Sequence, residues 1–124
     1  MGGISADKHH LLNTRAAWSS HMDAKWLREQ PTLVPTLDRG VHEELHATTP
    51  PVPLLGYHAL HIVRGTFHPA STTLGSIDRL TSAIEAAGNA RRMHYIDKQL
   101  CELAIRAIRL QVPILRGEVR EDWA

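Results

Sequence analysis

Apolar residues recur every three or four positions through the C-terminal half of the chain, and this spacing constrains the fold more than any other feature. The first stripe comprises Leu74, Ile77, Leu80 and Ile84, and the second comprises Met93, Ile96, Leu100, Leu103, Ala107 and Leu110. Such spacing places apolar side chains on one face of a helix. Gly88, between the stripes, is a typical helix stop. The pattern predicts helices over residues 73–88 and 91–111, packed as an antiparallel αα-hairpin.

The N-terminal half predicts three more helices, each bounded by proline or a capping residue. The first spans residues 15–29, the second begins near Thr36 or Asp38 and ends before Pro50, and the third spans residues 54–63. The short apolar segments 9–12 and 32–35 predict paired strands. The fold class is therefore expected to be mainly α, a small five-helix bundle with a short two-stranded β-ribbon from residues 9–12 and 32–35.

The helical stripes also predict which side chains form the core and which surface carries self-association. The expected core includes Trp18, Met22, Leu45, Ile77, Leu80, Ile84, Leu100 and Leu103. The apolar face of residues 93–110 is longer than a small core needs. A homodimer through residues 73–111 is therefore expected.

Length and composition predict a single domain, residues 1–124, in the cytoplasm. Within it we expect a flexible N-terminus over residues 1–8 and a helical part over residues 54–112 that ends in the hairpin. Cys101 is the only cysteine, so no intrachain disulfide forms, and its apolar setting predicts a buried, inert thiol. No apolar run reaches the ~20 residues that span a bilayer, so no membrane partner is expected. The net charge of +1 carries no nucleic-acid footprint, and nucleic-acid binding would need a local basic patch.

Histidine is the residue type that points to chemistry, with nine copies in 124 residues. Two clusters stand out, the pair His9-His10 and the run His42-Glu43-Glu44-Leu45-His46. His42 and His46 are four residues apart, so one ion can reach both from one face of a helix. Imidazole is also the usual general base near neutral pH. The two clusters predict a metal-dependent hydrolytic site.

The second cluster also matches the H-E-x-x-H pattern of zinc peptidases. In that interpretation Glu43 is the general base, and a third ligand comes from Glu85, Glu102 or His61. A zinc peptidase therefore remains a remote alternative.

Residues 8–46 resemble the HNH, or His-Me finger, nucleases. The matching stretches are Lys8-His9-His10-Leu11, then Pro31-Thr32-Leu33-Val34-Pro35, then Val41-His42-Glu43-Glu44-Leu45-His46. The segment is also similar to small proteins of actinobacteria and their phages with an HH…R..W…L.P…vHeelH…P outline. The nuclease resemblance implies a β-hairpin followed by a helix around one divalent ion, and cleavage of phosphodiester bonds.

By that resemblance His10 is the general base, His9 and His42 hold the metal, and His46 is a further metal ligand or a phosphate contact. Arg15 and Arg39 are close enough in sequence to clamp a phosphate of nucleic acid, and Arg15 is expected to assist catalysis. The cofactor is a divalent ion, Mg²⁺, Mn²⁺ or Zn²⁺.

Two alternatives use the same residues without cleavage. The site is then degenerate, or the protein is a non-catalytic regulatory, structural or nucleic-acid-binding protein of phage type whose histidines are structural. Convergence of the two histidine clusters in space would favour the metal site over structural histidines.

Overall fold

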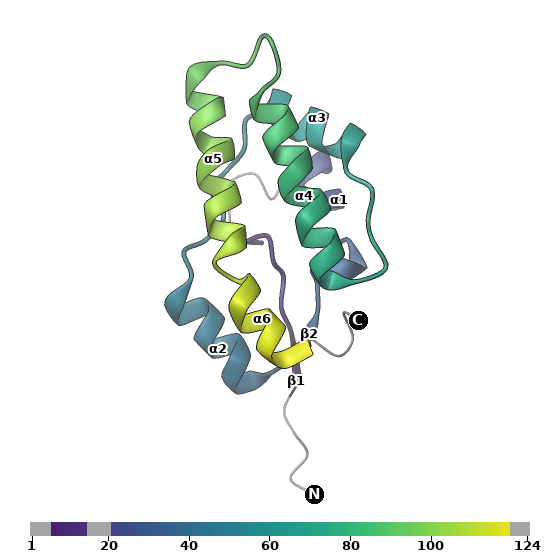
Figure 1. Ribbon diagram of the computed structural model, residues 1–124, viewed down its shortest axis with the longest axis vertical. Coiled ribbons are helices and arrows are strands. Elements are labelled where there is room, and N and C mark those ends of the chain that lie inside the picture. The colour runs from purple at the N-terminus through teal and green to yellow at the C-terminus, as the bar shows by residue number, and fades with distance from the viewer. Residues whose placement is uncertain (1–5, 15–20, 120–124) are drawn as a thin grey trace, which may run out of the picture.

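The computed structural model describes residues 6–14 and 21–119, and these residues form a helical bundle with a short β-ribbon (Figure 1). In chain order the elements are β1 (Ala6–Lys8), α1 (Met22–Arg28), the 3-10 helix η2 (Pro31–Leu33), β2 (Thr36–Asp38), α2 (Arg39–Thr48), α3 (Tyr57–Thr66), α4 (Thr73–Gly88), α5 (Tyr95–Arg109) and α6 (Val112–Val119). The expected fold class, a small helical bundle with a two-stranded ribbon, is confirmed. Helices α1 to α5 correspond to the five expected helices, and α6 is an addition.

The two strands lie outside the segments predicted for them, because β1 precedes residues 9–12 and β2 follows residues 32–35. β1 and β2 are antiparallel, with Ala6 opposite Asp38 and Lys8 opposite Thr36, whereas the predicted strands were residues 9–12 and 32–35. Those segments do lie side by side, because His9 N–H donates to the Pro35 carbonyl at 2.9 Å and Leu11 N–H to the Leu33 carbonyl at 3.0 Å. They do not form regular strands, because residues 31–33 turn as η2 and proline has no N–H for the ladder.

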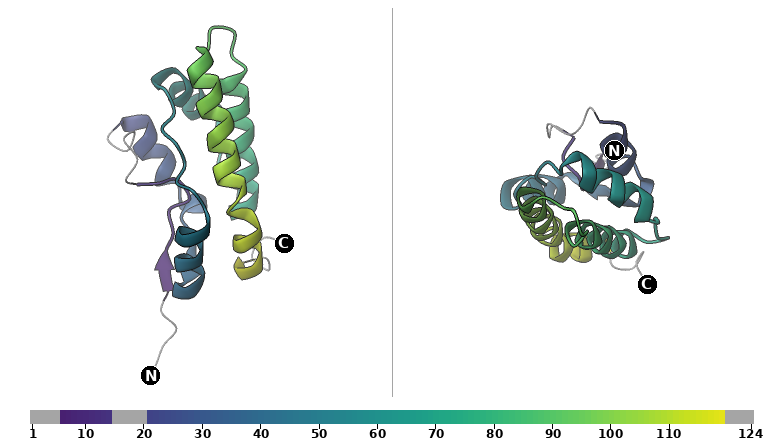
Figure 2. Two further views of the ribbon diagram at one scale, coloured as in Figure 1. Left: turned by 90° about the vertical axis from the view of Figure 1, so that its left-hand side faces the viewer. Right: turned by 90° about the horizontal axis from the view of Figure 1, so that it is seen from above.

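Helices α4 and α5 form the expected antiparallel hairpin and lie side by side in all views (Figures 1 and 2). Thr72 caps α4, accepting a hydrogen bond from the Gly75 N–H at 2.9 Å, and Asn89 follows its last turn. Helix α5 begins four residues later than expected. The His94 ring accepts a hydrogen bond from the Ile96 N–H at 3.2 Å and thereby caps the helix at Tyr95.

The face of α5 that packs against the core differs from the predicted face by about one residue. Its buried side chains are Cys101, Ala104, Ala107 and Ile108. Leu103 is 47 % exposed and Leu100 is half-buried, so the prediction that Leu103 is a core residue is wrong. The physical reason is a close helix–helix approach, since a Cβ at Gly88 would lie 3.2 Å from the Cβ of Cys101. Small side chains fit that contact, and the larger ones are left outside.

Helix α1 begins at Met22, where the His21 side chain caps it, and not near residue 15 as predicted; Trp18 lies outside the described residues. Met22 is 77 % exposed, so its predicted place in the core is wrong. It is the first residue of α1, and the apolar contacts come one turn later, where Trp26 meets Phe67 at a ring-centroid distance of 6.2 Å. The Arg64 guanidinium donates to the Asp23 carboxylate at 2.6 Å, which ties α3 to α1.

Helix α6 follows α5 closely and has Pro113 in its first turn. Proline is tolerated in the first turn of a helix, where its missing N–H has no helical partner. Leu115 is fully buried, and α6 packs against α2 (Figure 1). None of the helices in the described part of the chain, α6 included, is long and apolar enough to cross a membrane.

Cys101 is buried, as the sequence predicts. Burial raises the pKa of its thiol to about 11, and the neighbouring charges of Asp97 and Glu102 act in the same direction. The thiolate is the reactive form, so the folded protein keeps this cysteine inert.

The two faces of α5 predict different costs for truncating two residues of similar size. Ile108 is fully buried, so Ile108→Ala should lower the free energy of unfolding by about 2–5 kcal/mol. Leu103→Ala should cost less than about 1 kcal/mol, because that side chain is already half in water. Urea unfolding followed by circular dichroism measures both. Equal costs would contradict the observed orientation of α5.

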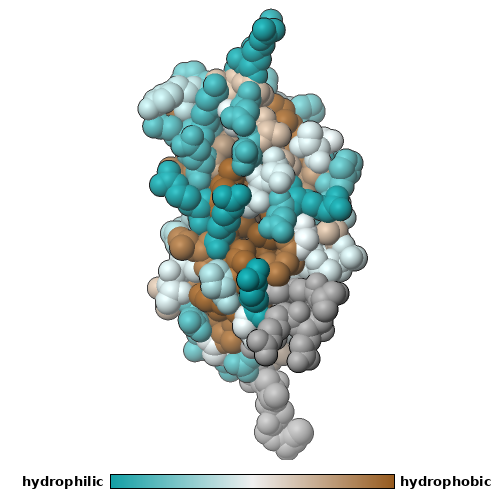
Figure 3. All heavy atoms as spheres, in the orientation of Figure 1, coloured by the Kyte–Doolittle hydropathy of each residue, from teal (hydrophilic) through white to brown (hydrophobic). Residues whose placement is uncertain are grey.

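The homodimer expected through residues 73–111 stays a prediction. Ile96 and Leu103 on α5 and Leu110, which follows the helix, are exposed, and the face formed by α4, α5 and α6 carries hydrophobic patches between hydrophilic side chains (Figure 3). Light scattering should give the mass of a dimer, and the double variant Ile96→Glu, Leu103→Glu should give that of a monomer. Lys98→Glu is the matched control on the same helix and should stay dimeric. A wild-type monomer at high concentration would remove the idea.

Candidate metal centre

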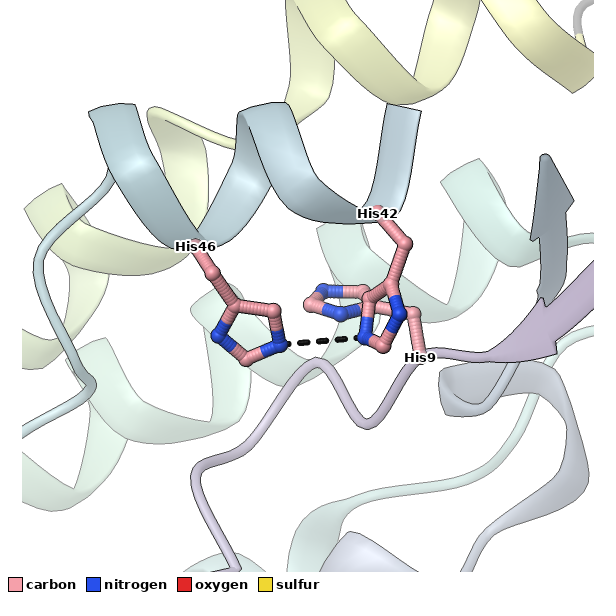
Figure 4. Close-up of side chains that lie close together, drawn as sticks. All are labelled: His9, His42 and His46. Carbon is pink, nitrogen blue, oxygen red and sulfur yellow. Dashed lines mark hydrogen bonds between the residues drawn. The ribbon is translucent and has the colours of Figure 1, made fainter. Parts of the chain in front are cut away.

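Three imidazole rings from two distant parts of the chain meet beside α2 (Figure 4). His9 follows β1, and His42 and His46 lie one turn apart on α2. One ring nitrogen from each residue lies within 4.8 Å of the others. The Nε2 atoms of His42 and His46 are 3.0 Å apart, and the ring of His9 faces both at centroid distances of 5.3 and 5.6 Å. One histidine of the first cluster, His9, thus lies beside both histidines of the second, whereas His10 is not part of the group.

The local sequence explains why the rings meet. β1 pairs with β2, and β2 runs directly into α2, because Asp38 is both the last residue of the strand and the cap of the helix. The Asp38 carboxylate accepts a hydrogen bond from the Gly40 N–H at 3.0 Å. His9 continues the register of the ribbon and therefore lies beside α2. Leu45, fully buried, anchors α2 to the core, so His42 and His46 flank it on the side toward His9.

Two polar side chains hold the rings from outside the cluster. The Asp7 carboxylate lies 3.2 Å from Nδ1 of His42, and the Gln111 amide oxygen lies 2.6 Å from Nε2 of His9. Metal-binding histidines usually donate their second ring nitrogen to such a partner, which fixes the ring. Asp7 and His9 are two residues apart, and residues at that spacing share a face of a strand. This spacing is the signal by which Asp7 could have been found. Nothing in the sequence pointed to Gln111, because it follows α5 and is 102 residues away from His9.

The environment keeps His9 neutral. Its side chain is 4 % exposed, and burial lowers its pKa to about 4, with the neighbouring imidazoles adding to the effect and the Gln111 hydrogen bond opposing it. Nδ1 of His9 is buried and has no hydrogen-bond partner among the described residues. A neutral imidazole with a free, inward-facing nitrogen is the form that binds a metal ion.

The cluster forms one wall of a pocket of about 650 Å³. The described residues that line it are Lys8, His9, His10, Leu11, Asn13, Thr14, His42, Leu45, His46, Thr49, Pro50, Pro51, Val52 and Gln111. The lining combines the histidines and Lys8 with prolines and aliphatic side chains. A pocket of this size takes a small molecule or one or two units of a polymer.

The other expected site residues are placed less centrally. His10 lines the pocket but faces Glu29, with 3.4 Å between its Nε2 and the carboxylate. Arg39 is 61 % exposed, lies 3.8 Å from Asp7, and is beside the pocket, not in its lining. Arg15 lies outside the described residues.

The residues that the peptidase interpretation adds to His42 and His46 do not join the cluster. Glu43 is exposed, and it is not among the described residues that line the pocket. His61, one of the suggested third ligands, lies on α3 with its Nδ1 3.9 Å from the Asp23 carboxylate. The third nitrogen comes instead from His9, so the geometry favours chemistry that does not use Glu43.

Comparison with protein-family models, with curated proteins and with solved structures finds no match to this chain. The function must therefore be inferred from the site itself. Its donor set is three imidazole nitrogens, which suits Zn²⁺, Cu²⁺, Ni²⁺ or Fe²⁺ better than Mg²⁺ or Mn²⁺, whose preferred ligands are oxygens.

The neutral state of His9 predicts how the stability of the metal-free protein depends on pH. The pKa of His9 falls from 6.5 in an unperturbed chain to about 4 in the folded one, so between these values only the unfolded state binds the proton. The contribution of His9 to the free energy of unfolding is thus fully present above pH 6.5 and decreases toward pH 4, by about 3 kcal/mol in total. Denaturant titrations in the presence of a chelator should show the decrease.

Two variants test whether His9 causes this decrease in stability at low pH. His9→Gln should have a flatter profile between pH 4 and 6.5, since the titrating group is gone. His68→Gln, which replaces an exposed histidine, should keep the wild-type slope. A wild-type slope in His9→Gln would contradict the assignment.

Proposed function

We propose that this protein is a metal-dependent hydrolase that cleaves phosphodiester bonds of nucleic acid. The observation that carries the proposal is the convergence of His9, His42 and His46 within 4.8 Å at the wall of a pocket. Three protein ligands leave a coordination position free, as in catalytic zinc sites and unlike structural ones. The order of elements supports the same proposal, because a β-ribbon that leads into a helix beside the metal ligands is what the HNH resemblance implies.

Zn²⁺ fits this site best among the expected ions. All three candidate ligand atoms are nitrogens, and the nearby Asp7 carboxylate is already directed at Nδ1 of His42. When bound, the ion would supply Lewis-acid polarisation of a phosphoryl oxygen and stabilisation of the charge that develops during hydrolysis.

His10 is the general base in this proposal. It lines the same pocket as the three ligands, and its ring is only partly buried, so water reaches it. Glu29, 3.4 Å away, orients the imidazole and stabilises the protonated form that arises when His10 takes a proton from water. Glu29 thus adds a positioning residue that the sequence did not indicate.

Cationic side chains around the pocket are proposed to hold the phosphate. Lys8 lines the pocket and is exposed. Arg39 is bound only loosely to Asp7, at 3.8 Å in a solvent-exposed position, so its guanidinium remains able to contact an oxyanion. Arg15, which lies outside the described residues, follows Thr14 of the pocket lining in sequence and is proposed as a further phosphate contact.

Substitutions of the histidines should separate metal binding from cleavage. His42→Ala should remove both, because a ligand is lost. His10→Ala should leave Zn²⁺ affinity within about threefold of wild type and lower the cleavage rate by roughly 10²–10⁴-fold, the usual contribution of a general base. Zn²⁺ competition with a chelating dye and cleavage of plasmid and single-stranded substrates measure the two properties.

The control is His94→Ala, which removes a helix cap on the opposite part of the molecule and should change neither property. Zn²⁺ binding without cleavage of any substrate would favour the non-catalytic alternative, a degenerate or regulatory metal-binding protein. Absence of Zn²⁺ binding by the folded wild type would return the histidines to structural roles.

A further inference from the structure

Gln111 lies at the junction of α5 and α6, where its side chain is buried against the metal centre. Its amide makes two hydrogen bonds to the N-terminal segment. The amide nitrogen donates to the Leu11 carbonyl at 3.0 Å, and the amide oxygen lies 2.6 Å from Nε2 of His9.

The Leu11 carbonyl decides which way the amide faces. A carbonyl oxygen only accepts hydrogen bonds, so the NH₂ group of Gln111 must face it. The opposite orientation would place two oxygens about 3 Å apart in a buried position, without a hydrogen between them. The oxygen of the amide therefore faces His9.

The amide in turn decides where His9 carries its hydrogen. An oxygen at 2.6 Å needs a donor, so Nε2 of His9 must be the protonated nitrogen. The ring is buried and neutral, which leaves Nδ1 with its lone pair. Nδ1 is also the buried atom without a partner among the described residues, and it belongs to the ring that faces His42 and His46.

We propose that Gln111 is a positioning residue that sets the tautomer of His9, so that Nδ1 is the atom offered to the metal ion. The inference rests on the proposed metal centre and deepens it, because it places control of the site in the C-terminal half of the chain. The Leu11 carbonyl fixes the orientation of the Gln111 amide, and the amide fixes the tautomer of His9. That tautomer leaves the lone pair of Nδ1 available to the ion.

The other two histidines differ from His9 in how they are set. The Asp7 carboxylate accepts from Nδ1 of His42, so His42 offers Nε2. Nε2 of His46 lies 3.0 Å from Nε2 of His42. Because Nε2 of His42 carries a lone pair, Nε2 of His46 carries the hydrogen between the two atoms in the metal-free protein. His46 must move this hydrogen to Nδ1 to become a ligand, and it is exposed, so solvent can carry the transfer. Two ligands are thus fixed in advance and one adjusts.

Gln111→Met and Gln111→Glu test the proposal together. Methionine has a similar volume but accepts no strong hydrogen bond, so His9 should lose its preference for the Nε2–H form. Glutamate keeps an acceptor for Nε2–H, and in its protonated form its O–H can donate to the Leu11 carbonyl in place of the amide NH₂, so it should preserve that form. The matched control is Gln99→Met on the exposed side of α5, where the glutamine bonds only to the Tyr95 hydroxyl among the described groups.

The tautomer is read directly from long-range ¹H–¹⁵N correlation spectra of metal-free, ¹⁵N-labelled protein. We expect Nε2–H at His9 in the wild type, Gln111→Glu and Gln99→Met, and a mixture or the Nδ1–H form in Gln111→Met. Zn²⁺ affinity, from competition with a chelating dye, should fall roughly 10–100-fold in Gln111→Met, as for other residues that orient a ligand. It should stay within tenfold of wild type in Gln111→Glu.

An Nδ1–H form of His9 in the wild type would overturn the proposal, as would a folded Gln111→Met variant with the wild-type tautomer and affinity. If Gln111→Met does not fold, the tautomers of the wild type and of Gln111→Glu still decide, since Nδ1–H in either overturns it. A tautomer that shifts as expected in a protein that binds no Zn²⁺ supports the role of Gln111 and refutes the proposed function instead.

Discussion

A buried imidazole has to be neutral and hydrogen-bonded, and the arrangement around His9 follows from that requirement. Burial keeps the ring uncharged, Gln111 accepts from one nitrogen, and the other nitrogen faces two further imidazoles. The bond to Gln111 also joins the segment after β1 to the junction between α5 and α6. The segment around His9 and the junction around Gln111 are thereby held together, and the candidate site is formed where they meet.

The shortness of the connections makes this place rigid. β2 passes into α2 at Asp38 without a linker, and the hydrogen bonds of His9 and Leu11 extend the ribbon past its regular strands. The rings are therefore positioned by backbone pairing on one side and by the helix on the other. Sites supported by regular elements keep their geometry better than sites on long loops.

Helices α1 to α5 and the αα-hairpin could be predicted because they depend on local spacing, and the sequence also singled out His9, His42 and His46 as candidate metal ligands. His42 and His46 meet because four residues make about one helical turn, and His9 was grouped with them by the HNH resemblance. Gln111 and Glu29 could not be found, since their roles depend on contacts between segments distant in sequence. The face of α5 was misjudged because larger apolar residues were assumed to lie inside, whereas the close contact at Gly88 selects Cys101, Ala104 and Ala107.

The ligand set also bears on how a chain with a net charge of +1 would hold an anionic substrate. Carboxylate ligands reduce the charge that a bound ion presents, but three neutral imidazoles leave a divalent ion its full charge. In the proposed function that charge, inside a partly apolar pocket where screening is weak, supplies the attraction that a basic surface provides in other nucleic-acid-binding proteins. Asp7, which contacts His42, would then offset part of the ion's charge, and Arg39, 3.8 Å from Asp7, would reduce that effect. The few cations around the pocket then need only to orient the phosphate, not to collect it.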